Sequence, residues 1–198
     1  MQDVKTFSVP YGGMDLTLEV GKYAFQADGS AMIKWGDVAI LSTVGIGAAR
    51  SGMDFFPLVV EFEPKFYAAG KFKHSRVNKR EGRRSDRDIL QCRVADRPLR
   101  PMFPKNTRSE VQVINTLLQT DGQYLCAPLS ITAASLCIQL SGVPFEQSVA
   151  GVHVGKDEKG NLMAGPTFEQ AEKNGLDLIV AGTADAITMV EAGADMIT

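Results

Sequence analysis

The segment that most constrains the fold is residues 127–140, APLSITAASLCIQL, which is apolar on nearly every face of a helix. A helix of this kind is buried all round, so we expect it to be the central helix of the fold. It ends at Ser141 and Gly142, where a glycine suited to a helix end is followed shortly by Pro144. A chain of 198 residues can bury a core of this kind without disulfides.

Alternating apolar and polar residues on both sides of this helix predict β-strands, and the first 70 residues are expected to be mostly antiparallel sheet. Turn residues join two pairs of strands, one at Gly36-Asp37 and one at Lys159-Gly160-Asn161. The expected strand segments are residues 14–20, 31–47 (the first pair), 54–72, 110–120, 149–165 (the second pair), 176–183 and 186–191. Strands and helices mix without a regular βαβ alternation. The fold class is therefore α+β, with a mostly antiparallel or mixed sheet, and residues 1–198 are expected to form one domain.

Two further helices are expected. One follows Ser85, which can cap a helix whose first turn carries acidic residues, and it is expected to end near Arg97 because Pro98 and Pro101 follow. A shorter helix starts at Thr167, where TFEQ forms a capping box. The buried stripe of the first helix is expected to consist of Ile89, Leu90, Cys92, Val94 and Ala95.

The charge is very unevenly distributed. Residues 65–108 hold 14 of the 21 basic residues but only 4 of the 23 acidic ones, and 9 of those 14 are arginines. Arginine suits bidentate contacts to phosphate. The block indicates an extended anionic partner, such as single-stranded nucleic acid or a polyphosphate. The alternative is a solvated basic loop that binds no partner.

Three arginines in this block have a defined geometry. Arg93 and Arg97 are four residues apart and so lie on one face of the helix, and Arg100 continues the row beyond the proline break. Asp96 can pair with Arg100 and orient its guanidinium. The row could clamp successive phosphates of a nucleic-acid strand, or it could be a set of ion pairs that hold sheet to helix.

The motifs of common hydrolases and nucleotide-binding loops are absent. His74 is expected in a loop and His153 as a half-exposed strand residue, and no metal-ligand cluster is evident. The three cysteines have no paired spacing, which is typical of buried thiols in a reducing compartment. No signal peptide is evident, and no apolar run approaches the ~20 residues that span a bilayer. We therefore expect a cytoplasmic protein without a membrane segment.

Four segments, in their order and spacing, resemble the first ribonuclease-PH-like domain of the polynucleotide phosphorylase family. They are DFFPLVVEFEPKFYAAGKF, KREGRRSDRDIL, RVADRPLRPMFP and EVQVINTLLQTDG. The stretch LTLEVGKYAFQADGSAMIKWGDVAILSTV near the start, SGVPF after the central helix and LDLIVAGTADAITMVE near the end extend the resemblance to essentially the whole chain.

The resemblance implies a concrete function. Members of this family are homotrimers in which each subunit adds two ribonuclease-PH-like domains to a ring around an RNA channel. They shorten single-stranded RNA from its 3′ end in mRNA turnover, with inorganic phosphate as nucleophile and nucleoside diphosphates as products. Mg²⁺ or Mn²⁺ supports a phosphoryl transfer dominated by positioning and charge neutralisation. Members of an RNA-degradation complex are further possible partners.

The resemblance also assigns roles to residues. The hydroxyl-rich phosphate-binding run and the metal-binding carboxylates of the family belong to its second domain, and residues 121–130 here, DGQYLCAPLS, hold no serine cluster. This chain is therefore expected to contain neither catalytic nor metal-binding residues. The positions that match arginines facing the RNA or the loop that grips it in the channel are Lys79, Arg80, Arg83, Arg93, Arg97 and Arg100.

One departure from the family pattern concerns the channel loop, where two aromatic residues often precede two basic ones. This sequence has Val77-Asn78 before Lys79-Arg80. Because stacking of an RNA base on an aromatic ring contributes ~1 to 3 kcal/mol, we expect weaker and more salt-sensitive entry of RNA at this loop.

The last residues, EAGADMIT, stop abruptly after an expected strand. We therefore expect the N-terminal portion of a longer multidomain enzyme, with phosphorolysis mainly in a second domain. One alternative is a non-catalytic, RNA-binding scaffold subunit of an exosome-like ring. The other is a plain oligomerisation module, which would have no affinity for RNA.

Overall fold

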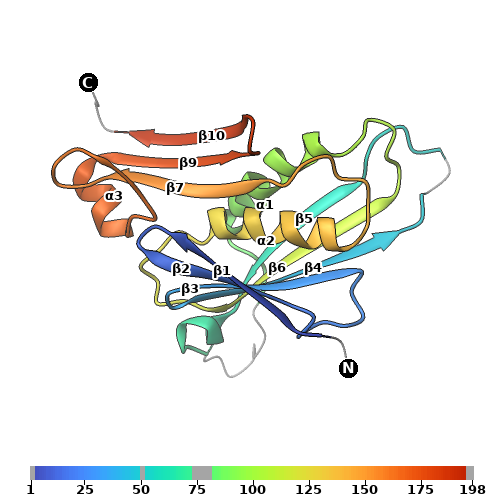
Figure 1. Cartoon of the computed structure of the whole chain (residues 1–198), viewed down its shortest axis with the longest axis horizontal. Helices are drawn as coiled ribbons and strands as arrows, with labels where there is room; N and C mark the ends of the chain where they lie inside the picture. The colour runs from blue at the N-terminus through green and yellow to red at the C-terminus, as the bar shows by residue number, and fades with distance from the viewer. Residues whose placement is uncertain (1–2, 50–51, 73–81, 195–198) are drawn as a thin grey trace.

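The strands form two sheets with helices between them in a computed structural model that describes residues 3–49, 52–72 and 82–194 (Figure 1). The larger sheet has the order β1-β2-β3-β4-β6-β5. Neighbouring strands are antiparallel except β5 and β6, which run parallel. Its strands are β1 (Lys5–Tyr11), β2 (Met14–Val20), β3 (Gly29–Trp35), β4 (Val38–Gly47), β5 (Leu58–Pro64) and β6 (Glu110–Gln119).

The smaller sheet is antiparallel throughout and has the order β10-β9-β7-β8. Its strands are β7 (Ala150–Lys156), β8 (Leu162–Ala164), β9 (Leu176–Gly182) and β10 (Ile187–Ala194). The short helix α3 (Phe168–Asn174) follows β8 and begins at the expected capping box, in which Thr167 and Gln170 hydrogen-bond reciprocally.

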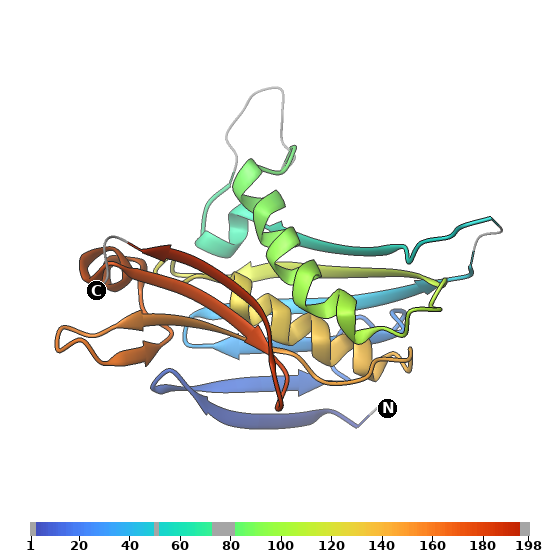
Figure 2. The ribbon, with the colours of Figure 1, turned by 90° about the horizontal axis from the view of Figure 1, so that it is seen from above.

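Helix α2 (Ala127–Leu140) lies between the two sheets and contacts β3, β4 and β6 on one side and β7 and β9 on the other. Ile131, Ala134, Cys137 and Ile138 are fully buried in the main core cluster. The prediction of a central buried helix is confirmed. Helix α1 (Asp86–Leu99) runs beside α2 and packs against β5, as Figure 2 shows.

Two glycines let the backbone of α2 lie directly on both sheets. A Cβ atom on Gly29 of β3 would be 2.3 Å from the Cys137 carbonyl oxygen, near the end of α2. A Cβ on Gly151 of β7 would be 2.6 Å from the Pro128 carbonyl oxygen, near its start. Any larger residue at either position would force helix and sheet apart.

The structure corrects three expectations about local structure. Helix α1 ends at Leu99 rather than near Arg97, with Pro98 inside its last turn and a 3₁₀ turn, η2 (Arg100–Met102), after it. The strand expected over residues 54–72 ends at Pro64, and residues Phe66–Ala69 form the 3₁₀ helix η1. Strand β1 was not anticipated, although Phe7, Val9 and Tyr11 alternate with Thr6, Ser8 and Pro10; nearly all its side chains are exposed at the sheet edge.

The α+β class is confirmed by the mixed larger sheet and the interposed helices. No helix in the described ranges has the length and continuous apolar character that crossing a lipid bilayer requires.

Candidate nucleic-acid interface

The start of α1 is fixed by a capping box. The Ser85 hydroxyl accepts a hydrogen bond from the backbone N–H of Asp88 (3.3 Å), and the Asp88 carboxylate accepts one from the backbone N–H of Ser85 (2.9 Å). These bonds satisfy N–H groups that have no partner within the helix. The basic residues that precede Ser85 are therefore attached to a well-defined helix end.

Three arginines share the exposed face of α1. Arg93, Arg97 and Arg100 follow one another at intervals of four and three residues, and all three are exposed. Because the helix continues through Pro98, no break separates Arg100 from the other two, contrary to the expectation from the sequence. The structure places the whole predicted row on one helix face.

Arg100 uses most of its donors within the protein. Its Nε and Nη2 donate to the two carboxylate oxygens of Asp96 (3.0 and 2.7 Å), which confirms the predicted pair. Nη1 donates to the Phe56 carbonyl (3.1 Å) and Nη2 to the Leu58 carbonyl (3.0 Å). Four of the five N–H groups of a guanidinium are thus accounted for. Arg100 ties the end of α1 to the segment that enters β5.

The other two arginines are much less engaged. Arg97 lies 3.7 Å from the Glu191 carboxylate on β10, with both side chains about half exposed. An exposed ion pair of this length contributes little to stability. Arg93 forms no ion pair with any other residue that the structure describes. The guanidinium groups of Arg93 and Arg97 are accordingly free to meet an external anion.

The same face of α1 also carries two apolar side chains, which corrects the expected buried stripe. Ile89 is 41% exposed and Leu90 55% exposed, whereas Val94 and Ala95 are buried as predicted. All the buried residues of α1 lie in its second half, so its first two turns contribute no buried side chain to the core. The exposed face is therefore mixed, with apolar residues at its start and arginines toward its end.

Arg83 lies in the wall of a crevice of about 440 Å³, formed where β5 and β6 end, between η1 and the beginning of α1. Figure 2 shows η1 and the first turn of α1 side by side at this place. Three further basic residues, Lys65, Lys71 and Arg84, line the same crevice.

Two of these basic residues are held by acidic residues of β5. The Arg84 Nη2 atom lies 2.8 Å from a Glu61 carboxylate oxygen and 3.3 Å from one of Glu63, and the hydrogen bond to Glu61 raises the pKa of Arg84. Lys65 lies 2.8 Å from Glu63, and this hydrogen bond lowers the pKa of the Glu63 carboxyl. The ion pairs of Glu61 and Glu63 therefore hold Arg84 and Lys65 at one side of the crevice.

The remaining two predicted contact residues, Lys79 and Arg80, lie outside the described residues, as do Val77 and Asn78 of the same loop and His74. The role of Lys79 and Arg80 in gripping RNA therefore stays a prediction.

The N-terminus of α2 presents no hydroxyl groups. Cys126 occupies the N-cap but its thiol does not cap the helix and instead donates to the Tyr124 carbonyl (3.8 Å), and Pro128 follows in the first turn. The Ser130 hydroxyl is buried and donates to the Ala127 carbonyl (2.7 Å). Burial raises the pKa of the Cys126 thiol to about 11, so the thiol stays protonated near neutral pH. This helix end holds no group that could bind or activate phosphate as a run of serines would.

His153 is buried rather than half-exposed, with 3% of its surface accessible. Its Nε2 lies 2.8 Å from a carboxylate oxygen of Asp177 on the neighbouring strand, and its backbone N–H donates to the Tyr11 hydroxyl (3.4 Å). Its burial follows the alternation of β7, in which Gly151, His153 and Gly155 are buried and the residues between them are only partly buried.

The donor set for a metal ion is also missing from the part of the chain that the structure describes, where no three His, Cys, Asp or Glu side chains come together. The described residues therefore do not fit the Mg²⁺ or Mn²⁺ that the resemblance implies.

Sequence reasoning missed two residues of the crevice, Phe66 and Lys71. They follow β5 in FYAAGKF, which was interpreted as part of a strand. The signal that could have identified them is the glycine-ended turn after Pro64, since Gly70 adopts a left-handed conformation (φ 65°) that ends η1.

Residues 14–144 match the family described as 3′ exoribonuclease family, domain 1. Because this match covers more than half of the chain, the chain belongs to the 3′ exoribonuclease family. The resemblance predicted from its motifs is confirmed at this level.

Individual proteins that are similar to this chain carry the name polyribonucleotide nucleotidyltransferase. The chain is 42% identical over 196 residues to that of Bacillus cytotoxicus, covering 99% of this chain and 27% of the relative. It is 45% identical over 195 residues to that of Heliobacterium modesticaldum, covering 97% of this chain and again 27% of the relative. The chain therefore spans only about a quarter of the length of these relatives.

The fold also matches a solved structure, rice (Oryza sativa) Rrp46, with a TM-score of 0.70 and 14% sequence identity. The match covers 100% of this chain and 83% of the rice protein. At this identity the likeness concerns the fold, and it confirms the ribonuclease-PH-like α+β architecture.

Proposed function

We propose that this chain is the RNA-binding first domain of a phosphorolytic 3′-to-5′ exoribonuclease, a polyribonucleotide nucleotidyltransferase that releases nucleoside diphosphates in mRNA turnover. The observation that carries the proposal is the basic surface of α1 and the adjoining crevice, where Arg93 and Arg97 are exposed on the helix and Arg83 is exposed just before its N-cap. The identity to the bacterial relatives over nearly the whole chain supports it.

In this proposal residues 1–198 form one ribonuclease-PH-like domain, and catalysis takes place mainly in a second domain. The start of α2, where the Ser130 hydroxyl is buried and bonded to the Ala127 carbonyl, supports that division. Inorganic phosphate and Mg²⁺ or Mn²⁺ would act in the longer enzyme, which we propose to be a cytoplasmic homotrimer that can join an RNA-degradation complex. The arginines would contact phosphates, which positions RNA without reading its sequence.

A second candidate function is a non-catalytic RNA-binding scaffold of an exosome-like ring. The same start of α2 favours it, together with the missing metal-donor cluster among the described residues. The two candidates differ in whether the natural reading frame continues into a domain with a serine-rich phosphate loop. Both differ from a plain oligomerisation module in requiring affinity for RNA.

The test is a gel of 5′-labelled single-stranded RNA incubated with this chain and Mg²⁺, with and without inorganic phosphate. We expect intact RNA that is retarded on a native gel at low salt. The double variant Arg93→Gln/Arg97→Gln should reduce the slope of log affinity against log salt by about 1 to 2. Lys5→Gln is the matched control, because Lys5 is an exposed lysine of β1, at the opposite edge of the larger sheet from β5, against which α1 packs.

Phosphate-dependent shortening of the RNA would show that this chain has an active site and would overturn the assignment of catalysis to a second domain. RNA that is not retarded at any salt concentration would overturn the RNA-binding role itself and favour the oligomerisation module.

A further inference from the structure

The crevice between η1 and α1 lies at a favourable place in the fold for a ligand. Strands β5 and β6 are parallel neighbours, and the chain crosses from one to the other through η1 and α1. In such units ligands commonly bind in the crevice beyond the carboxyl ends of the strands, beside the start of the crossover helix. Pro64 and Leu117, near the carboxyl ends of β5 and β6, and Ser85, at the start of α1, all line the crevice.

The charge of the crevice wall is positive once internal ion pairs are counted. Glu63 is paired with Lys65 and Arg84, and Asp88 is held in the capping box of α1. Among the described residues, Lys71 and Arg83 form no ion pair. Two cations therefore remain for an anion that enters the crevice.

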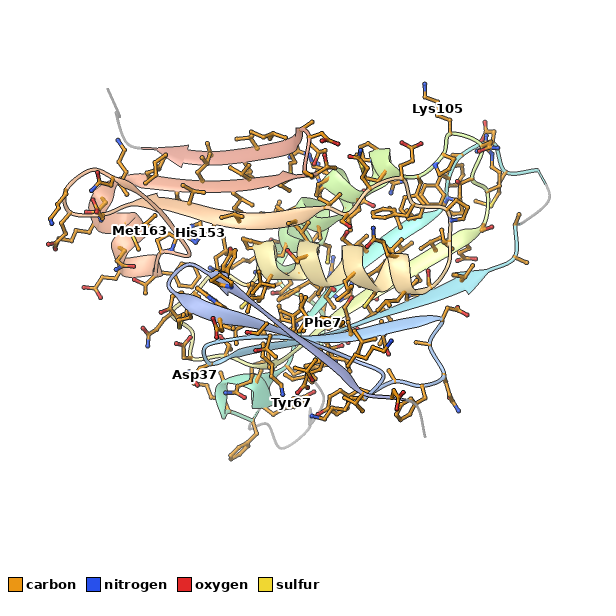
Figure 3. All side chains as sticks on the ribbon, viewed as in Figure 1. Phe7, Asp37, Tyr67, Lys105, His153 and Met163 are labelled. Carbon is orange, nitrogen blue, oxygen red and sulfur yellow. The ribbon has the colours of Figure 1, made fainter. Side chains whose placement is uncertain are left out.

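Aromatic side chains accompany these cations. Phe66 lines the crevice and is 42% exposed, and two more aromatic residues of the same segment, Tyr67 (56%) and Phe72 (80%), are exposed although they do not line it. Figure 3 shows Tyr67 on η1 at the lower edge of the molecule, below the larger sheet. Exposed aromatic rings beside basic groups are the combination that binds single-stranded nucleic acid, because bases stack on the rings while cations follow the backbone.

We propose that this crevice is a nucleotide subsite for single-stranded RNA, in which a base stacks on Phe66 and the adjoining phosphate contacts Lys71 and Arg83. The subsite rests on the RNA-binding role proposed above and deepens it. It places an aromatic stacking surface on η1, in a chain that has Val77 and Asn78 at the positions where the family often has two aromatic residues.

The decisive comparison is between an RNA oligomer and an abasic ribose-phosphate oligomer of the same length, measured by fluorescence anisotropy. The wild-type chain should bind the RNA more tightly than the abasic oligomer. Phe66→Leu, which keeps an apolar side chain but removes the ring, should weaken RNA binding by about tenfold and leave abasic binding unchanged. Phe25→Leu, at an exposed phenylalanine in the turn between β2 and β3, is the matched control.

The phosphate contact is tested separately. Lys71→Gln should weaken the binding of both oligomers and lower the salt slope by about one. Lys105→Gln, which lies far from η1, should change neither oligomer's affinity by as much (Figure 3). Lys71 is exposed and has no ion pair in the described ranges, so its replacement keeps the test valid even if Phe66→Leu fails to fold.

Each outcome bears on a different claim. If the wild-type chain binds neither oligomer, the proposed RNA-binding function fails. If it binds RNA and the abasic oligomer equally, or if folded Phe66→Leu and Lys71→Gln bind both like the wild type, the subsite is wrong while the RNA-binding role stands. The subsite is supported if Phe66→Leu loses the preference for RNA over the abasic oligomer while Lys71→Gln weakens the binding of both oligomers.

Discussion

At the scale of single residues, Arg100 and Arg93 occupy the same helix face but have different surroundings. The Arg100 guanidinium donates to Asp96 and to the carbonyls of Phe56 and Leu58, whereas Arg93 has no ion pair in the described part of the chain. Sequence spacing placed both residues correctly on one face. It could not show that one of them is held by the protein itself.

This difference predicts opposite responses to substitution. Arg100→Gln should lower the free energy of unfolding by about 1 to 2 kcal/mol, because it removes charge-assisted hydrogen bonds and leaves two carbonyls to find other donors. Arg93→Gln should change stability by less than about 0.5 kcal/mol and should instead weaken RNA binding. Urea unfolding and RNA titration of both variants measure the two effects.

An Arg100→Gln variant with wild-type stability but reduced RNA affinity would contradict this division. It would mean that Arg100 exchanges its internal acceptors for phosphate, so that the whole row contacts RNA. Equal loss of stability in Arg93→Gln would show that the exposed face of α1 packs against something in the folded chain.

The candidate site could be predicted in part. Helix spacing placed Arg93 and Arg97 on one face, because a period of 3.6 residues is visible in the sequence, whereas Arg83 was assigned only from the family resemblance. The contact of all three with RNA stays a prediction. The acceptors of Arg100 lie 44 and 42 residues away along the chain, so no local pattern points to them. Lys71 was missed for the same reason, since only the folded turn after β5 brings it beside Arg83.

At the scale of elements, the helices and strands with a buried face were predicted well, whereas elements at the edge of the fold were predicted poorly. The strand and helix patterns identified β2 to β4, β6, α2 and the pair β7 and β8, because each has a buried face that leaves a pattern in the sequence. The edge strand β1 and the first turns of α1 have no such face. The alternation of apolar residues also does not indicate whether two strands pair in parallel or antiparallel. The parallel alignment of β5 with β6 is therefore seen only in the structure.

The close approach of α2 to both sheets predicts a strong dependence on two glycines. Gly29→Ala and Gly151→Ala should each lower the free energy of unfolding by about 1 to 3 kcal/mol, because the added methyl group meets helix backbone rather than a flexible side chain. Gly45→Ala in β4 is the control, since a Cβ there meets no atom within 4 Å. It should be neutral or slightly stabilising.

Thermal or urea unfolding of the three variants distinguishes the outcomes. Wild-type stability in Gly29→Ala or Gly151→Ala would show that α2 can shift between the sheets without loss of packing. That result would contradict the view that both sheets fix the helix by direct backbone contact.

At the scale of the whole molecule, the central position of α2 also couples stability to pH. Burial raises the pKa of the Cys137 thiol to about 11, and the pKa of Cys126 is raised to about 11 for the same reason. Cys137 lies between the sheets, and its Sγ donates to the Ser42 carbonyl at 3.1 Å. The native state therefore strongly prefers the neutral thiol, whereas an unfolded chain ionises it at the ordinary pKa near 9.

The sign follows from this raised pKa. Below pH 9 the thiol is neutral in both states, so its contribution to stability is fully present, and it is lost as the pH rises toward 11. At about 1.4 kcal/mol per pKa unit, each thiol should cost roughly 2 kcal/mol across this range. Cys137→Ala should remove about half of the alkaline loss that the two thiols produce, measured as unfolding free energy at pH 8 and pH 10.5. Val149→Ala, a buried control in the same core cluster, should lower stability equally at both pH values. An unchanged alkaline loss in Cys137→Ala would mean that water reaches the thiol, and that the layers around α2 open without global unfolding.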